Sequence, residues 1–271
     1  MDITTLLALA ALLAAVGAGA GLIAGLLGVG GGIVLVPAYF HALSALGFDG
    51  PDIMRVCVAT SLSTIVVTSL RSLQAHARRG AVDWGILRRW APGIALGAVG
   101  GMLATASFSS ATLQAIFGAI ALGVGLYLAL GRPDWRVADA MPGPLGRAAL
   151  SPGVGFLSVL MGIGGGSFGV PLMTLHGVPM HRAVATAAGF GAAIAIPSVI
   201  GFLLAPVAEP RPPLQLGSVN LAAFALTVAM TLVTAPWGAS LAHRTDARRL
   251  RRVFGLFLIV VAANMAREAV A

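Results

Sequence analysis

Apolar stretches of roughly 18 to 25 residues, the length that a helix needs to cross the hydrocarbon core of a bilayer, recur along almost the whole chain. Only short polar patches separate them. Hydrophobic residues make up 58% of the 271 residues and charged residues 10%, and the mean hydropathy is +0.95, so an ordinary soluble surface is excluded. We therefore predict an all-α polytopic membrane protein.

The predicted helices fall into two groups of five. A Pro- and Gly-rich linker at 132–146 separates a first transmembrane repeat, 1–131, from a second, 147–271, and both repeats belong to one membrane domain. The predicted helical segments are 5–27, 33–47, 53–74, 85–106, 111–130, 148–162, 168–178, 182–206, 217–242 and 249–270.

One glycine-rich motif occurs once in each half. Gly28–Pro37 and Gly162–Pro171 share the pattern Gly-x-Gly-Gly-Gly, then four residues that end in valine, then proline. Further matches between the halves follow each copy, which predicts that the two halves share one fold. These matches pair Arg55 with Arg182, Ala59–Thr60 with Ala185–Thr186, and Val82–Asp83 with Val219–Asn220.

The charges of equivalent loops predict how the halves are oriented. Residues 71–89 carry five arginines, whereas their counterpart at 205–217 carries one arginine and one glutamate. Conversely, 106–111 is uncharged and its counterpart around 244–252 carries five arginines. Because arginine-rich loops stay in the cytoplasm, we predict inverted-topology repeats, a common plan of secondary transporters, with both termini extracytoplasmic.

The second and seventh predicted segments, 33–47 and 168–178, are about 22 and 16 Å long, too short to cross a core of ~30 Å. We expect broken or re-entrant hairpins there, with both glycine triplets turning inside the membrane. Irregular backbone at that depth needs protein or a water-filled cavity to supply hydrogen bonds. Glycine amides and the positive end of the following helix favour an anion, although close helix packing is an alternative role for the glycines.

Polar residues near the turns complete the predicted anion site. Arg55 and Arg182 begin equivalent helices and suit an oxyanion, or else a snorkelling role at the interface. Nearby hydroxyl groups either donate to the anion or bond to their own helix. Arg71 is interpreted as an anchor at the inner interface, and the histidines as structural. The predicted substrate-binding residues are Gly30, Gly31, Gly32, Gly164, Gly165, Gly166, Ser167, Thr60, Ser61, Thr186, Arg55 and Arg182.

Composition argues against several other functions. All nine acidic residues fall in predicted loops or termini, which argues against metal-cation transport and against an embedded proton relay. The chain has no lysine, one cysteine and no catalytic constellation, so we expect no metal, no cofactor and no enzyme activity. The net charge of +8 comes from arginines, mostly in loops, and indicates membrane topology rather than nucleic-acid binding. Proton coupling stays open, since the substrate itself can carry the proton.

Three features together resemble one known family: the doubled glycine motif, the Arg and Ala-Thr pattern after each copy, and the segment His76–Trp84. That family is the TauE/SafE sulfite-exporter family of membrane permeases, and the resemblance covers essentially the whole chain. It implies a bacterial inner-membrane carrier that moves sulfite, sulfoacetate or a related organosulfonate, usually outward. Thr60-Ser61 becomes Thr186-Ala187 in the second half, which departs from a symmetric site.

We therefore expect a secondary transporter that exports a small sulfur-containing anion across the lipid bilayer by alternating access. A carrier of another small organic acid is the first alternative. A membrane scaffold or assembly factor that transports nothing is the second. A hydrated, amide-lined cavity would favour transport, and a sealed hairpin region would favour the scaffold.

Overall fold

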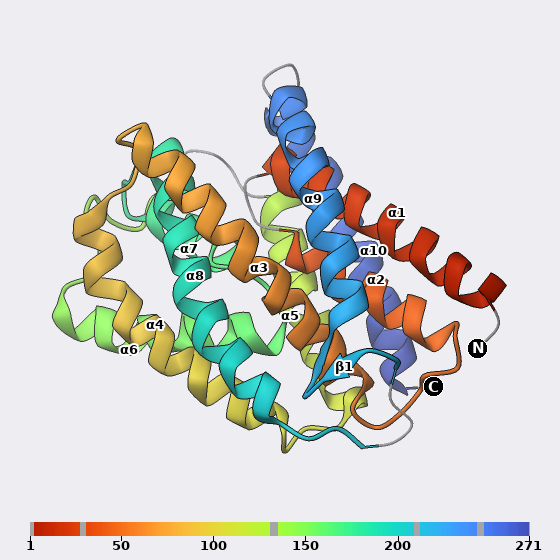
Figure 1. Cartoon of the computed structure of the whole chain (residues 1–271). Coiled ribbons are helices and arrows are strands. Elements are labelled where there is room, and N and C mark those ends of the chain that lie inside the picture. The colour runs from red at the N-terminus through yellow and green to blue at the C-terminus, as the bar shows by residue number, and fades with distance from the viewer. Residues whose placement is uncertain (1–2, 28–30, 131–134, 209–211, 243–246, 271) are drawn as a thin grey trace.

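The computed structural model describes the chain except for residues 1–2, 28–30, 131–134, 209–211, 243–246 and 271. Within the described ranges the chain forms ten helices and one short β-hairpin (Figure 1). Each helix coincides with one predicted segment, with ends that differ by a few residues, so the all-helical fold class is confirmed. The helices are α1 (Ile3–Leu27), α2 (Gly32–Ser44), α3 (Ile53–Arg78), α4 (Trp84–Thr105), α5 (Ser110–Leu130), α6 (Pro144–Leu160), α7 (Gly166–Leu175), α8 (Met180–Leu204), α9 (Leu221–Ala242) and α10 (Ala247–Val270).

Two boundaries differ from the sequence prediction. Residues 217–220, expected to begin a helix, belong instead to a β-hairpin in which β1 (Gln215–Leu216) pairs antiparallel with β2 (Val219–Asn220). Gly217 lies in the hairpin turn with a φ of +54°, a conformation that suits a residue without a β-carbon. α6 begins at Pro144, within the predicted linker, because proline is well tolerated in the first turn of a helix.

Length and hydropathy separate spanning helices from shorter ones. Among the described residues, four segments are long and apolar enough to cross a bilayer: Ile53–Arg78, Ser110–Leu130, Met180–Leu204 and Leu221–Gly238. By contrast, α2 and α7 have 13 and 10 residues. At 1.5 Å per residue they are about 20 and 15 Å long, shorter than the hydrocarbon core. The two elements predicted to be too short to span are therefore short in the structure.

The helices exchange partners between the two halves of the chain (Figure 1). α1 packs along α9, and α6 packs along α4, so the first helix of each half lies against the fourth helix of the other half. α3 packs on α8, and α5 packs on α10. Thr60, near the start of α3, bonds to Asn220 beyond the end of α8. Thr186, near the start of α8, bonds to Asp83 beyond the end of α3, so these two equivalent helices run antiparallel.

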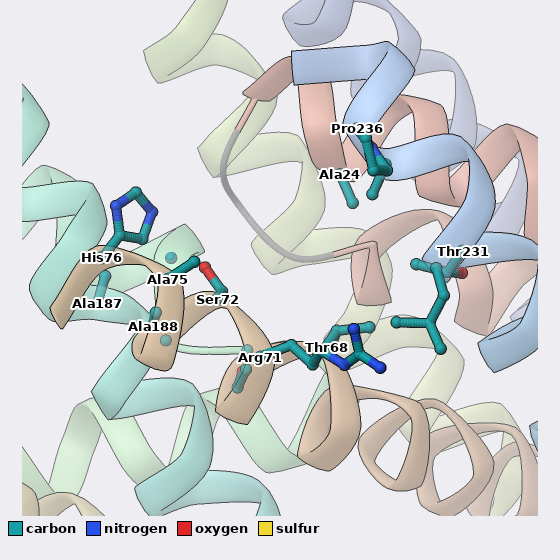
Figure 2. Close-up of a pocket in the computed structure, with 16 residues that line it drawn as sticks. Ala24, Thr68, Arg71, Ser72, Ala75, His76, Ala187, Ala188, Thr231 and Pro236 are labelled. Carbon is teal, nitrogen blue, oxygen red and sulfur yellow. The ribbon is translucent and has the colours of Figure 1, made fainter. Parts of the chain in front are cut away.

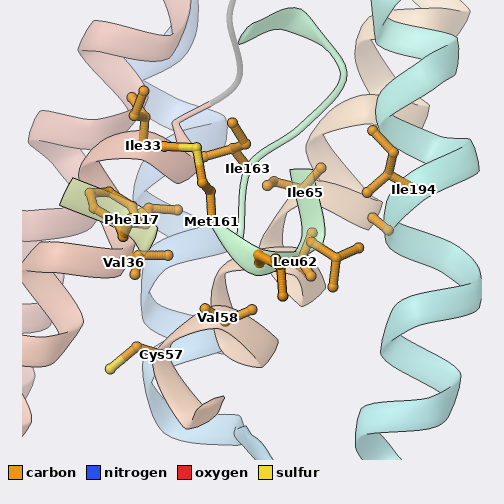
Figure 3. Close-up of a cluster of buried hydrophobic side chains, with 14 of the residues drawn as sticks. Ile33, Val36, Cys57, Val58, Leu62, Ile65, Phe117, Met161, Ile163 and Ile194 are labelled. Carbon is orange, nitrogen blue, oxygen red and sulfur yellow. The ribbon is translucent and has the colours of Figure 1, made fainter. Parts of the chain in front are cut away.

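A cluster of buried hydrophobic side chains lies at the centre of the bundle (Figure 3). It gathers around the first half of α3, where every residue from Ile53 to Ile65 is buried. α2 contributes Ile33 and Val36, and the turn between α6 and α7 contributes Met161 and Ile163. The core therefore sits where the two glycine-rich stretches come together.

Glycines let α4 and α6 approach each other closely. A β-carbon added to Gly155 would lie 2.8 Å from the backbone nitrogen of Ala98, and one added to Gly101 would lie 2.8 Å from the carbonyl oxygen of Phe156. Membrane helices associate largely through such packing of small residues. The contact between α4 and α6 is therefore sensitive to a single methyl group.

Replacing Gly155 with alanine should lower the thermal unfolding temperature. The added methyl group overpacks the helix contact at a cost of about 1–3 kcal/mol, which outweighs the gain in helix propensity of about 1 kcal/mol. Gly153→Ala is the matched control, because open space surrounds Gly153 on the same helix, and it should be neutral or stabilising. Unfolding in detergent can be followed through the single, buried thiol of Cys57 with a fluorogenic maleimide. Equal shifts for both variants would contradict the close contact.

Candidate functional site

The two glycine-rich stretches are in direct contact. A β-carbon added to Gly32 would lie 2.6 Å from the carbonyl oxygen of Gly162 and 3.0 Å from the α-carbon of Ile163. Gly162 has a φ of +63°, and a β-carbon on it would lie 2.6 Å from Cγ2 of Val36. Ser61 Oγ donates a hydrogen bond of 2.7 Å to the Gly162 carbonyl oxygen. Ser61 and Gly32, from the first half, thus pack directly on the second glycine turn.

A cavity of about 410 Å³ lies beside the second glycine stretch (Figure 2). Gly164, Gly165 and Gly166 line it where α7 begins, and residues of α1, α3, α8 and α9 form its other walls. Most of the lining side chains are small or carry a hydroxyl group. A space of this size lies within the range of sites that hold small organic ligands.

The start of α7 presents backbone amides to this cavity. α7 begins at Gly166, so the N–H groups of its first turn have no acceptor within the helix, and the positive end of its dipole is directed at the same place. Gly165 is tightly enclosed, since a β-carbon there would lie 2.6 Å from the Ala187 carbonyl oxygen. Gly164 has more room, with Ile65 Cγ2 at 3.3 Å from its notional β-carbon. Amides at a helix start that have no acceptor within the helix are suited to binding an anion.

Arg71 places a positive charge in the cavity. α3 lines the cavity over its second half, from Thr68 to His76. In Figure 2 the Arg71 guanidinium extends from α3 toward the side of the cavity formed by α9, where Thr231 lies. The described lining residues include no carboxylate, so this charge is not neutralised within the cavity wall. Arg71 is exposed, so its place on the cavity wall adds to its interpretation as an interfacial anchor and leaves that interpretation untested.

Thr60 and Thr186 hold helix starts in the opposite half of the chain. Thr60 Oγ1 accepts a hydrogen bond of 3.0 Å from the Asn220 amide, and Thr186 Oγ1 accepts one of 2.9 Å from the Asp83 amide. Asn220 Oδ1 in turn accepts from the Ala223 amide at the start of α9, and Asp83 Oδ1 accepts from the Ile86 amide at the start of α4. Neither threonine lines the cavity. Both hydroxyls thus accept bonds from the backbone rather than facing the cavity.

Arg55 is held at the opposite end of α3 from the cavity. Its guanidinium lies 2.9 Å from Asp52 Oδ2 and donates a hydrogen bond of 2.7 Å to the Pro206 carbonyl oxygen. Asp52 Oδ2 also accepts from the Ala208 amide at 2.8 Å. These bonds tie the start of α3 to the segment that follows α8. Arg55 and the cavity-lining Thr68 are about 20 Å apart along the helix axis at 1.5 Å per residue.

The remaining predicted residues are dispersed. Ser167 is buried in the first turn of α7, and its hydroxyl has no hydrogen-bond partner among the described residues. Arg182 is exposed near the start of α8. A β-carbon on Gly31 would lie 3.1 Å from the Ala20 carbonyl oxygen, so Gly31 supports packing of α2 on α1. Gly30 lies outside the described residues.

The sequence analysis missed the polar face of α3. The missed cavity-lining residues on that helix are Thr68, Ser69, Arg71, Ser72 and His76. A helix brings residues three and four positions apart onto one side, so polar residues at such spacing within an apolar helix indicate a face that meets a cavity. That spacing was readable from the sequence. The other walls of the cavity come from helices that are distant in the sequence, so the sequence alone did not indicate them.

The fold and the cavity define a class of protein. Three helices long and apolar enough to cross a bilayer, α3, α8 and α9, line a cavity that also takes in Arg71 and the glycines at the start of α7. This is the construction of a multi-pass membrane transporter, whose polar groups within the membrane line a substrate path.

Comparisons with known proteins indicate the same class of protein. The family profile of the sulfite exporter TauE/SafE matches residues 13–265, and the chain belongs to that family. It is 32% identical over 251 residues to a probable membrane transporter protein of Haemophilus influenzae, covering 92% of this chain and 95% of that protein. A probable membrane transporter protein of Methanocaldococcus jannaschii is 28% identical over 206 residues, 72% of each chain. No solved structure matches significantly.

Replacing Thr60 or Thr186 with valine should destabilise the protein by about 1–2 kcal/mol, because each change leaves a backbone N–H without its acceptor. Thr174→Val is the matched control, since the Thr174 hydroxyl bonds only to carbonyl groups of its own helix. The measurement is the unfolding temperature in detergent, with and without an anion. A variant with unchanged stability and lost anion binding would instead favour a direct role of the threonine in binding.

Proposed function

We propose that this protein is a secondary transporter that exports a small sulfur-containing anion, such as sulfite, sulfoacetate or a related organosulfonate, by alternating access. The observation that carries the proposal is that Arg71 and the glycines at the start of α7 line one cavity whose described lining residues include no carboxylate. Membership of the sulfite exporter family supports the substrate class. The same family membership supports an inner-membrane location.

The proposed substrate-binding groups are those that reach the cavity. Arg71 supplies bidentate, charge-assisted hydrogen bonds that suit an oxyanion. Gly164, Gly165 and Gly166 supply backbone amides, and Thr68 and Thr231 supply hydroxyl groups. The substrate would exchange its hydration shell for these donors.

The halves are proposed to be inverted repeats. The antiparallel packing of the equivalent helices α3 and α8 supports this arrangement, as does the exchange of first and fourth helices between the halves. In an inverted pair, one half can rock against the other and expose a central site alternately to the two sides. Gly32 of the first half and Gly162 of the second lie against each other where the two halves meet.

The charge pattern supports an orientation in the membrane. Arg71 on α3 and Thr231 on α9 line one cavity, so the second half of α3 and the later part of α9 lie at the same end of the bundle. Arginine-rich loops follow both helices in the sequence, at 78–89 and 244–252. By the positive-inside rule that end faces the cytoplasm, and both termini lie outside. The cavity would then be open to the cytoplasm, as an exporter needs for loading.

The other end of the path is proposed to be closed by the Arg55 and Asp52 contacts. α3 is buried from Ile53 to Ile65 and reaches the cavity only from Thr68 onward. At the closed end, Arg55 and Asp52 tie α3 to Pro206 and Ala208. Opening toward the outside would require these bonds to separate.

Arg71→Gln should lower anion counterflow in proteoliposomes by about tenfold or more, because it removes a charge-assisted hydrogen bond of about 1.5–3 kcal/mol. Labelled sulfite, sulfonates and carboxylates are compared, which separates the proposed substrate from another small organic acid. Arg78→Gln is the control, since Arg78 is exposed on the same helix and does not line the cavity. Counterflow by Arg71→Gln at the wild-type rate would contradict the proposal, and no counterflow of any anion by the wild-type chain would favour a scaffold.

Asp52→Asn should weaken the contacts of Arg55 and Ala208 that close this end of the path. It should therefore increase the labelling of Cys57 from outside by severalfold. Cys57 is fully buried on α3, two residues beyond Arg55, so it reports on opening of this segment. The measurement uses a membrane-impermeant maleimide on intact cells, with unfolding temperatures to verify folding. Asp49→Asn, a change at an exposed aspartate in the same loop, is the control. Unchanged labelling of Cys57 in Asp52→Asn would refute the closing role.

A further inference from the structure

The cavity has a second basic group that the proposed function does not use. His76 lines it on α3, one helical turn beyond Ser72 and on the side where Ala187 of α8 lies (Figure 2). Its ring is half-buried, and the described residues supply no hydrogen-bond partner for it. A histidine that held the fold together would be expected to bond to a neighbouring group. The ring of His76 is therefore free to meet a ligand in the cavity.

His76 and Arg71 face different walls of the same cavity. Five residues separate them, which turns the two side chains about 140° apart around the helix at 3.6 residues per turn. Arg71 extends toward α9, whereas His76 lies beside Ala187. The cavity lined by Gly164–Gly166 therefore has a permanent cation and an ionisable group on different parts of its wall.

The charged groups around His76 are few. Arg71 shares the cavity, Arg78 and Arg79 follow on the same chain segment, and the carboxylate of Asp83 is engaged at the start of α4. The described lining residues of α1, α7, α8 and α9 carry no charge. Among the described lining residues, His76 is consequently the one whose side-chain type has its ordinary pKa between pH 5 and 8.

We propose that His76 is a second, pH-dependent anion-binding group of this cavity and sets its preference between doubly and singly charged anions. This inference rests on the proposed anion site. With His76 protonated, the cavity holds two cationic groups and favours a dianion. With His76 neutral, Arg71 alone remains, and the extra attraction for the second negative charge is lost.

The test compares sulfate, a dianion, with methanesulfonate, a monoanion, because both keep their charge from about pH 6 to about pH 8, the range over which histidine titrates. Apparent Kd values come from the stabilisation of detergent-purified protein against thermal unfolding at increasing anion concentration. In the wild-type chain the preference for sulfate should fall roughly fivefold from the lower to the higher pH, as one charge–charge interaction is lost. His76→Gln should show the low preference at both pH values, and His76→Arg the high preference at both.

His181→Gln is the matched control, because His181 is exposed at the start of α8 and does not line the cavity. It should keep the wild-type pH dependence. A His76→Gln protein that keeps the wild-type dependence, or a wild-type preference that does not change with pH, overturns the role of His76. If Arg71→Gln still weakens anion binding by about tenfold or more in that case, the proposed site stands without His76. If neither anion stabilises the wild-type chain at either pH, both proposals fall.

Discussion

The close contact between the start of α2 and the turn between α6 and α7 is the constraint on which the rest of the structure depends. Peptide groups in a hydrocarbon environment need partners, so two broken helices persist there only if each covers the other's open backbone. Gly32 and Gly162 permit that approach, and the Ser61 hydroxyl satisfies the Gly162 carbonyl group. The hydrophobic cluster around α3 closes over the contact (Figure 3). The cavity lies beside the start of α7, where Gly164–Gly166 line it.

Hydrogen bonds that cross between the halves fix the positions of the surrounding helices. A threonine on α3 accepts from the backbone just before α9, and the equivalent threonine on α8 accepts from the backbone just before α4. Each half thus anchors a helix start of the other. α9 and α4 are also the helices against which α1 and α6 pack, so the same two connections position both outer helix pairs. The two halves are therefore joined by packing and by hydrogen bonds that cross between them.

The two halves share sequence motifs but differ at residues where function is proposed. Ser61 donates to a turn carbonyl, whereas the corresponding Ala187 has no hydroxyl and lines the cavity. Arg55 is bound by Asp52, whereas Arg182 is exposed and Pro179 stands at the start of its helix. The start of α3 is therefore held by the bonds of Arg55, whereas the second half of α3 lines the cavity. Such asymmetry would favour one access state of a carrier over the other.

The sequence alone determined the membrane class, the ten helices and the shortness of α2 and α7, because hydropathy and helix length are properties of contiguous segments. It also identified Gly164–Gly166 as residues that reach a cavity. Only the tertiary structure decided the partners of the polar side chains. Thr60, Thr186 and Arg55 bond to backbone more than a hundred residues away, and Arg71 and His76 share a cavity with α9 and α8. The sequence gives the chemistry of each side chain. Its hydrogen-bond partner depends on which distant segment of the chain packs against it.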